Sequence, residues 1–214
     1  AGDIIRAQIT AYTSATVVSV KPNATVPVTM QAVAISDWTE CVATVTGLWH
    51  LEGETVSVFG DGFVVANPNN ESYTLVTVAN GSVTLDKPYG VIHIGLPYIS
   101  DIETLDIDQS GPVSIVDRKK NISKVTVFCE KSRGIWVGAT PPTSDATNPL
   151  EGLYEAKIRN SEDYDSPVDL LTGTVQVNLR SEWNSNGRVF LRQVDPVPLT
   201  ILAVMPAGEI PFVR

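Results

Sequence analysis

The fold is decided by one stretch of the sequence, Gly47-Leu48-Trp49-His50-Leu51-Glu52-Gly53-Glu54-Thr55-Val56-Ser57-Val58-Phe59-Gly60-Asp61-Gly62. Its second half alternates polar and apolar residues, which predicts a strand with one face in the core. In this pattern Thr55 and Ser57 face the solvent. The residues that we expect on the core side are Leu48, Leu51, Val56 and Val58.

Two dipeptides predict tight turns on either side of this strand. Asp61-Gly62 favours a hairpin, because both residues tolerate the positive φ that such a turn requires, and Phe63-Val64-Val65 is then the returning strand. Asn80-Gly81 is the same kind of signal. It predicts a second hairpin, between Tyr73–Val78 and Ser82–Leu85.

Short apolar or alternating runs predict strands along the rest of the chain. Gly90–Leu96 is nearly continuously apolar, which is typical of a strand covered on both faces. We expect Gly187–Val194 to pair with Gly173–Leu179, and only Leu150–Arg159 has room for a short helix. The other predicted strands are Ile4–Tyr12, Thr16–Val20, Asp101–Asp108, Ile122–Glu130 and Leu199–Met205, with weaker ones at Val26–Met30 and Ala32–Ile35.

The predicted fold class is all-β, an antiparallel β-sandwich of jelly-roll-like type with a small N-terminal β-subdomain. We expect residues 1–46 to form a hairpin- or barrel-like subdomain and residues 47–214 to form the sandwich. A chain of 214 residues buries roughly 70% of its unfolded surface, so its core needs neither disulfides nor metals.

The formal net charge of −9 argues against a general nucleic-acid binder, which carries a basic surface. An acidic surface repels phosphate, so it suits a passage along which DNA slides; it also suits simple solubility. No apolar run approaches 18 residues, so no transmembrane helix is predicted.

The residues that most often carry chemistry are few and scattered. His50 and His93 are far apart in the sequence and fit no metal-ligand spacing, and Cys41 and Cys129 are too few for a zinc site or a disulfide scaffold. Cys129 alternates within a strand, which favours a small core residue; a bridge to Cys41 stays open. Nucleophile-elbow and nucleotide-binding glycine motifs are absent. We therefore predict no catalytic, cofactor-binding or metal-ligating residue.

Two other groups allow a sharper interpretation. Asp101 and Glu103 lie on one face of a predicted strand, as a glycosidase acid pair could, but Tyr98 is the only aromatic residue nearby. An acidic edge that discourages aberrant strand pairing is the favoured interpretation. The four tryptophans lie near predicted turns, where they serve packing or present a contact surface for another subunit or a glycan: Trp38, Trp49, Trp136 and Trp183.

Four segments carry a further pattern, in this order along the chain: Gln8-Ile9-Thr10-Ala11-Tyr12-Thr13-Ser14-Ala15-Thr16-Val17-Val18; Gly47–Val56 with Asp61-Gly62; Gly95-Leu96-Pro97-Tyr98-Ile99-Ser100-Asp101-Ile102-Glu103-Thr104-Leu105; and Val189–Met205 with its Asp195-Pro196-x-Pro198-Leu199-Thr200-Ile201-Leu202. Together they resemble the tail hub or nozzle proteins of short-tailed bacteriophages, also called tail tubular protein B or DNA-stabilisation proteins.

The resemblance implies a structural virion protein and not an enzyme, with this chain as the C-terminal portion of a longer one. It implies a ring of copies, commonly a hexamer, that extends the DNA-ejection channel below the portal and helps to retain packaged DNA. The implied partners are other copies, other tail and portal-adaptor proteins, and passing DNA without sequence-specific binding. Neither cofactors nor membrane insertion are implied. The implied location is the phage tail, after assembly in the host bacterial cytoplasm.

Two alternatives from other classes stay open. One is a carbohydrate- or receptor-binding β-sandwich module of a phage tail, which uses exposed aromatic residues such as Trp136 and Trp183. The other is a glycan-cleaving enzyme that uses Asp101 and Glu103.

Overall fold

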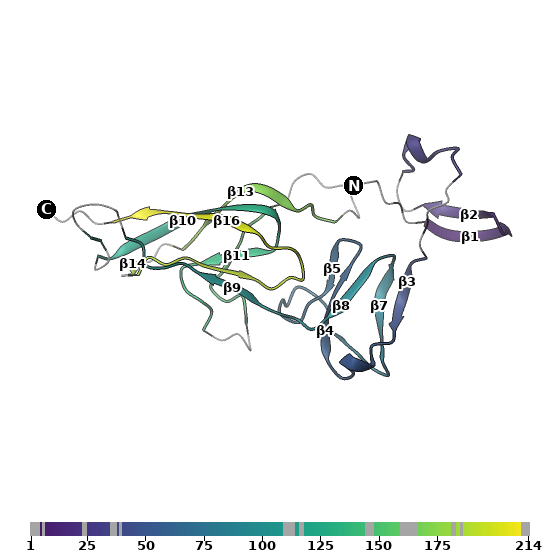
Figure 1. Ribbon diagram of the computed structural model, residues 1–214, viewed down its shortest axis with the longest axis horizontal. Coiled ribbons are helices and arrows are strands. Elements are labelled where there is room, and N and C mark those ends of the chain that lie inside the picture. The colour runs from purple at the N-terminus through teal and green to yellow at the C-terminus, as the bar shows by residue number, and fades with distance from the viewer. Residues whose placement is uncertain are drawn as a thin grey trace. The chain divides into compact units, whose positions relative to one another are not determined.

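The computed structural model describes residues 5, 7–22, 25–34, 38, 40–108, 114–115, 118–143, 148–158, 167–180, 183–184 and 186–210. Its elements are antiparallel strands and short 3₁₀ turns, which confirms the predicted all-β class (Figure 1). The chain divides into unit 1, Ala1–Glu40, and unit 2, Cys41–Arg214. The sequence led us to expect the boundary after Thr46, at the end of strand β3 (Val42–Thr46). Strand β3 instead belongs to unit 2, where it pairs with β7 (Ser82–Tyr89).

Unit 1 contains one hairpin. Strands β1 (Ala7–Ser14) and β2 (Val17–Pro22) pair antiparallel across a short turn, with irregular register after Ile9 and after Tyr12. A 3₁₀ turn, η1 (Val28–Met30), follows. The weaker strand prediction for Val26–Met30 is therefore wrong, because Pro27 has no N–H for a ladder and starts a turn instead. Ala32–Ile35 also opens with a turn residue of positive φ, Ala32, and Ile35 lies outside the described residues.

The first part of unit 2, here called the lobe, is built around the stretch Gly47–Gly62. A 3₁₀ turn, η2 (Trp49–Leu51), leads into β4 (Thr55–Gly60), which pairs with β5 (Phe63–Ala66), β6 (Val76–Thr77) and β8 (Ile92–Gly95). Its core cluster contains Leu51, Val56, Val58, Ala66, Val78, Val83, Leu85 and Tyr89, with Leu48 packed against it. The predicted core side is therefore confirmed.

Three expectations for the lobe are wrong. Ser57 is buried, not on a wet face, because the loop that begins at Asn67 covers it. The Asn80-Gly81 turn forms with positive φ at both residues, but its two arms pair only at Ala79–Ser82. Beyond that bridge β6 pairs with β4 and β7 pairs with β3. Strand β8 pairs with β4 and exposes His93, so it is not covered on both faces.

The second part of unit 2, here called the sandwich, consists of two four-stranded antiparallel sheets. The first holds β10 (Lys120–Ser132), with β13 (Leu171–Asn178), β14 (Trp183–Asn184) and β16 (Ile201–Glu209) as its partners. The second has the order β12 (Tyr154–Glu155), β11 (Ile135–Gly138), β15 (Phe190–Gln193) and β9 (Ser100–Glu103).

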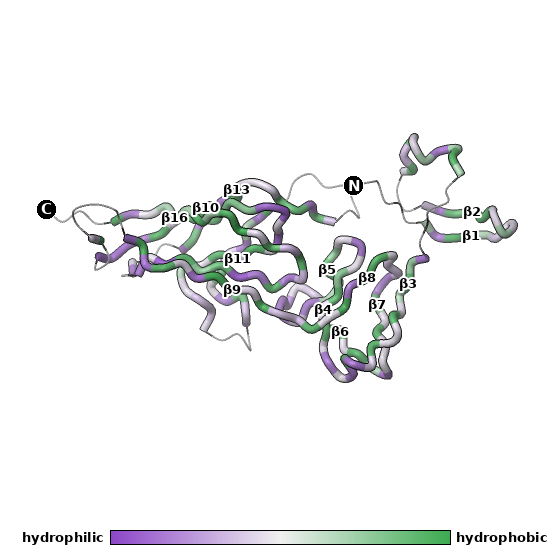
Figure 2. The backbone as a smooth tube through the Cα atoms, in the orientation of Figure 1, coloured by the Kyte–Doolittle hydropathy of each residue, from purple (hydrophilic) through white to green (hydrophobic). Residues whose placement is uncertain are grey.

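Both sheets contribute alternate residues to one core. Figure 2 shows that hydrophobic and hydrophilic residues are interspersed along these strands. Its buried members are Ile122, Val125, Val127, Cys129, Ile135, Val137, Ala156, Val175, Val177, Leu179, Val189 and Leu191. Val127, at the centre of β10, is fully buried between β13 and β16. This arrangement confirms the predicted β-sandwich class.

Four details of the sandwich differ from expectation. Gly187–Val194 does not pair with Gly173–Leu179: β15 pairs with β11 and β9, while β13 pairs with β10. The short helix at Leu150–Arg159 is absent through Ile158, where a turn with Gly152 at positive φ precedes β12. The acidic strand at Asp101–Asp108 ends at Glu103. Strand β16 is half-buried at its start and exposed towards its end, so Leu199–Met205 is not a fully buried strand.

Candidate functional site

The histidines and cysteines do not form a reactive centre within the described part of the chain. His50 is exposed on η2, and His93 is exposed on β8, where its ring centroid lies 6.4 Å from that of Phe59. Cys41 and Cys129 are both free thiols, so the bridge left open by the sequence does not form. Burial raises the pKa of the Cys129 thiol, as expected of a core cysteine. No group of three or more metal-ligating side chains gathers among the described residues.

Asp101 and Glu103 lie on the edge strand β9, and each faces an arginine. Both carboxylate oxygens of Asp101 accept from Arg192, at 2.7 Å from Nε and 2.7 Å from Nη2. Glu103 accepts from Arg188 Nη1 at 3.2 Å, and Arg188 also bonds Asp106. These bonds raise the pKa of the Arg188 guanidinium. The acids of this edge therefore bind β9 to the strand and loop beside it.

The tryptophans lie in four separate settings. Trp38 and Trp49 are largely exposed, and the Trp49 ring covers Gly81, where an added Cβ would lie 2.5 Å from the ring. Trp183 is about half exposed on β14. Trp136, on β11, is half-buried and lines a small hollow. Trp49 thus packs on a turn, while Trp136 and Trp183 are accessible for contact.

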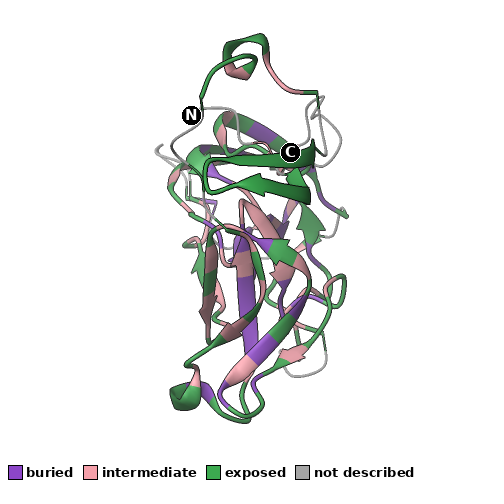
Figure 3. Cartoon of the chain, turned by 90° about the vertical axis from the view of Figure 1, so that its right-hand side faces the viewer, coloured by how far each residue is buried: buried purple, intermediate pink, exposed green. Residues whose placement is uncertain are grey.

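The hairpin of unit 1 presents an apolar face to solvent. Residues that are directly opposite in the β1–β2 register share a face, and the pairs Ala7–Pro22, Ile9–Val20 and Tyr12–Val18 are apolar. The pairs Gln8–Lys21 and Ala11–Ser19 form the more polar face. Ile9 is 59% exposed and Tyr12 is 73% exposed. None of the described residues of unit 1 is buried (Figure 3).

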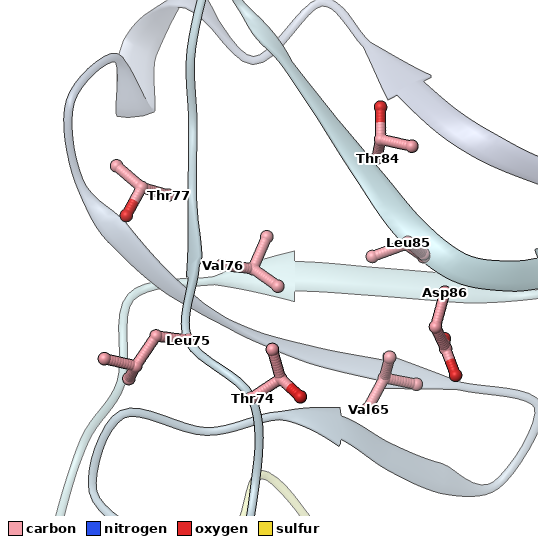
Figure 4. Close-up of a pocket in the computed structure, with 8 residues that line it drawn as sticks. All are labelled: Val65, Thr74, Leu75, Val76, Thr77, Thr84, Leu85 and Asp86. Carbon is pink, nitrogen blue, oxygen red and sulfur yellow. The ribbon is translucent and has the colours of Figure 1, made fainter.

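A second open feature lies where the arms of the Asn80-Gly81 turn separate. Figure 4 shows Thr74–Thr77 on one side of a hollow and Thr84, Leu85 and Asp86 on the other, with Val65 below. The hollow has a volume of about 460 Å³. As far as the structure is described, β6 pairs only with β4 and β7 only with β3, so each strand has an edge without a ladder partner. These edges are places where a further strand can pair.

A buried polar cluster, here called the seam, joins the lobe to the sandwich. Asn67 is fully buried, and its Nδ2 donates to Val194 O and to Asp195 Oδ1, each at 2.9 Å. Asn70 Nδ2 donates to the same Asp195 oxygen at 3.4 Å. Arg133 donates to Val168 O at 2.5 Å and to Gly62 O at 2.8 Å. Every buried side-chain nitrogen and oxygen of the described residues has a hydrogen-bond partner.

The seam holds a buried carboxyl, that of Asp195, near a partly buried guanidinium, that of Arg133. Burial raises the pKa of the Asp195 carboxyl; hydrogen bonds from Asn67 and Asn70, and the charge of Arg133, partly offset that rise. Burial lowers the pKa of the Arg133 guanidinium, and the nearby Tyr73 and Asp195 partly offset it. Sequence reasoning missed this cluster, since Asn67–Ser72 resembles an ordinary polar loop and Asp195-Pro196 an ordinary corner. The two segments form a buried cluster only because the fold brings Asn67 and Asn70 into hydrogen-bonding distance of Asp195.

No protein-family model matches the chain, and no curated protein is significantly similar to it. Among the described residues, no helix is long and apolar enough to cross a membrane. The features that bear on function are therefore the exposed hairpin, the open strand edges and the hollow beside Trp136.

Proposed function

We propose that this chain is a structural virion protein, part of a bacteriophage tail hub or nozzle that extends the DNA-ejection channel and helps to retain packaged DNA. In this proposal it acts by association with other copies and with tail and portal-adaptor proteins, as a ring in the virion. The resemblance of its four sequence segments to that family motivates the proposal. The single structural observation that carries it is the exposed apolar face of the β1–β2 hairpin.

An isolated two-stranded hairpin is marginal in water, because it has no second layer to bury its apolar face. The β1–β2 hairpin nevertheless has Ile9, Tyr12, Val18 and Val20 on one exposed face. Burial of apolar area stabilises by roughly 25 cal/mol per Å², so covering this face with a neighbouring copy is favourable. Exposed patches of this kind mark interaction surfaces. We assign this face to contact between copies.

The hairpin also suits this role electrostatically. Between Ala7 and Pro22 the only charged residue is Lys21, whereas the whole chain carries −9. Copies with such a net charge repel one another, so a contact is most favourable where the acidic residues are absent. The excess of acidic residues in the rest of the chain suits a channel wall, because an anionic surface repels DNA and limits its adsorption to the wall.

The test uses two adjacent substitutions on opposite faces of β2. Val20→Asp places a charge on the apolar face, while Ser19→Asp places the same charge on the polar face. Analytical ultracentrifugation of the chain over a range of concentrations measures association. We expect self-association for the wild type and for Ser19→Asp, and a shift to monomer for Val20→Asp.

Circular dichroism of both variants controls for folding. The assembly proposal fails if the wild type stays monomeric at every concentration, or if both substitutions reduce association equally. A reduction specific to Val20→Asp places the contact on the apolar face.

A further inference from the structure

A hollow of about 150 Å³ lies against Trp136, between two loops of unit 2. Its wall on the lobe side is formed by Asn69, Asn70, Glu71 and Ser72, and its wall on the sandwich side by Asn148, Pro149 and Leu150. The volume is small beside the roughly 300–1,000 Å³ of pockets for drug-sized ligands, so it has room for about one sugar ring.

Trp136 faces this hollow because of strand alternation. Its neighbours Ile135 and Val137 on β11 are buried in the sandwich core, so Trp136 points to the other face of the sheet. It is directly opposite Arg192 on β15, and Arg192 is opposite Asp101 on β9. Trp136 is also opposite Glu155 on β12. The indole thus lies inside a cross-strand row on the outer face of the sandwich, between Glu155 and Arg192.

The loop on the sandwich side is held by that row. Arg192 is 3% exposed, and its guanidinium is fixed by both oxygens of Asp101. Its Nη1 donates to Pro149 O at 2.7 Å. Asn148 is exposed and its Oδ1 accepts from Leu150 N at 3.1 Å, while its Nδ2 has no hydrogen-bond partner among the described residues. The position of this wall is therefore set by an ion pair in which the guanidinium is buried and the carboxylate is partly exposed.

The loop on the lobe side is held by the seam. Asn70, 8% exposed, donates to Asp195, while its Oδ1 accepts from Ser72 N at 3.1 Å. The amide of Asn69 donates to Tyr98 O, so its Oδ1 is available as an acceptor. The Glu71 carboxylate and the Ser72 hydroxyl have no hydrogen-bond partner among the described residues. Both walls are thus preorganised, with polar groups left over for a ligand.

We propose that this hollow binds one neutral sugar residue of a glycan. The apolar C–H face of a pyranose packs on an indole, while amide, hydroxyl and carboxylate groups complement its vicinal hydroxyls. The lining includes the acid Glu71 and no Lys or Arg, so phosphorylated or uronic ligands are disfavoured. This site is independent of the assembly proposed above, and a monomer would keep it.

The experiment measures binding of glucose, galactose, mannose and N-acetylglucosamine, with glucuronic acid as an anionic counterpart. Saturation-transfer NMR on the whole chain detects binding, and titration calorimetry gives the Kd. The variants are Trp136→Ala and Asn148→Ala. The matched control is Trp183→Ala, which removes an accessible tryptophan that does not line the hollow.

We expect at least one neutral sugar to bind, with glucuronic acid weaker than glucose. Trp136→Ala should weaken binding by about tenfold, and Asn148→Ala, in an exposed loop, by about threefold. Trp183→Ala should leave binding unchanged. If Trp136→Ala does not fold by circular dichroism, Asn148→Ala decides. The proposal is overturned if no neutral sugar binds at about 10 mM, if glucuronic acid binds more tightly than glucose, or if Trp183→Ala weakens binding as much as the substitutions in the hollow.

Discussion

At the scale of single residues, Glu52 and Asp61 hold two later turns of the lobe in place. The Glu52 carboxylate accepts from Asn80 N at 2.8 Å and from Gly81 N at 2.6 Å. The Asp61 carboxylate accepts from Gly90 N at 2.9 Å and from Val91 N at 2.7 Å. Each acid thus satisfies two backbone donors that a turn leaves without ladder partners. This is why the stretch Gly47–Gly62 organises the strands that follow it.

We expect Glu52→Ala to lower the free energy of unfolding by about 1 kcal/mol, because two charge-assisted hydrogen bonds to the Asn80-Gly81 turn are lost at a partly solvated site. The matched control is Glu54→Ala, two residues away and also exposed. Urea unfolding measures both. Equal losses for the two variants would show that the carboxylate of Glu52 does not hold the turn.

A second residue-scale prediction concerns Asp195. Burial raises its pKa above the ordinary value of 3.8, so the folded chain binds this proton more tightly than the unfolded chain does. Its contribution to stability therefore falls as the pH rises from 3.8 through the folded-state pKa. Asp195→Asn does not titrate. We expect the unfolding free energy of the wild type minus that of Asp195→Asn to decrease across this window and to level off above it.

Urea unfolding at a series of pH values from about 3 to 7 measures this difference. Asp169→Asn, the same substitution at an exposed position, is measured in parallel. A difference that rises with pH for Asp195→Asn would mean that Arg133 and the two asparagines outweigh burial.

At the scale of elements, the local sequence predicted the turns and the buried faces of strands. It did not predict which strands pair, because pairing depends on residues far apart in the sequence. Asp61-Gly62 and Asn80-Gly81 both form turns with positive φ, because only a few residue types tolerate that backbone. The alternation around Val56 and Cys129 correctly placed both in cores. The strand partners were predicted wrongly: β7 pairs with β3, and β15 pairs with β11 and β9. The backbone groups along a strand edge are the same in every strand, so the sequence of one strand does not specify its neighbour.

The candidate sites followed the same division. Trp136 was recognisable as an aromatic contact residue, but the hollow beside it depends on Asn69–Ser72 and Asn148–Leu150, which lie far apart in the sequence. The seam was not predictable, since Asn67 and Asp195 become partners only when the lobe packs on the sandwich.

The central strand of the sandwich gives an element-scale prediction. Val127 on β10 is fully buried between β13 and β16, so Val127→Ala should cost roughly 2 kcal/mol of unfolding free energy through the cavity it leaves. Ser123→Ala, at an exposed position of the same strand, should change it by less than about 0.5 kcal/mol. Thermal and urea unfolding measure both variants. A small loss at Val127 would mean that β10 is not the centre of the core.

At the scale of the whole molecule, the chain combines a well-packed unit 2 with a unit 1 in which no described residue is buried. A chain of net charge −9 that keeps an apolar hairpin face in solvent lowers its free energy when a neighbour covers that face. In the proposed function, association between copies and an anionic surface towards DNA would be two consequences of one distribution of residues. Binding of a sugar at the Trp136 hollow would add a contact to a glycan without altering either.

The most direct measurement of the central claim is hydrogen exchange of the β1–β2 amides as a function of protein concentration. If copies associate through the apolar face of this hairpin, the amides of Ala7–Ser14 and Val17–Val20 gain protection as the concentration rises. In the Val20→Asp variant they should exchange fast throughout. Fast exchange of the wild-type hairpin at every concentration, with the amides of β10 protected, would contradict the account.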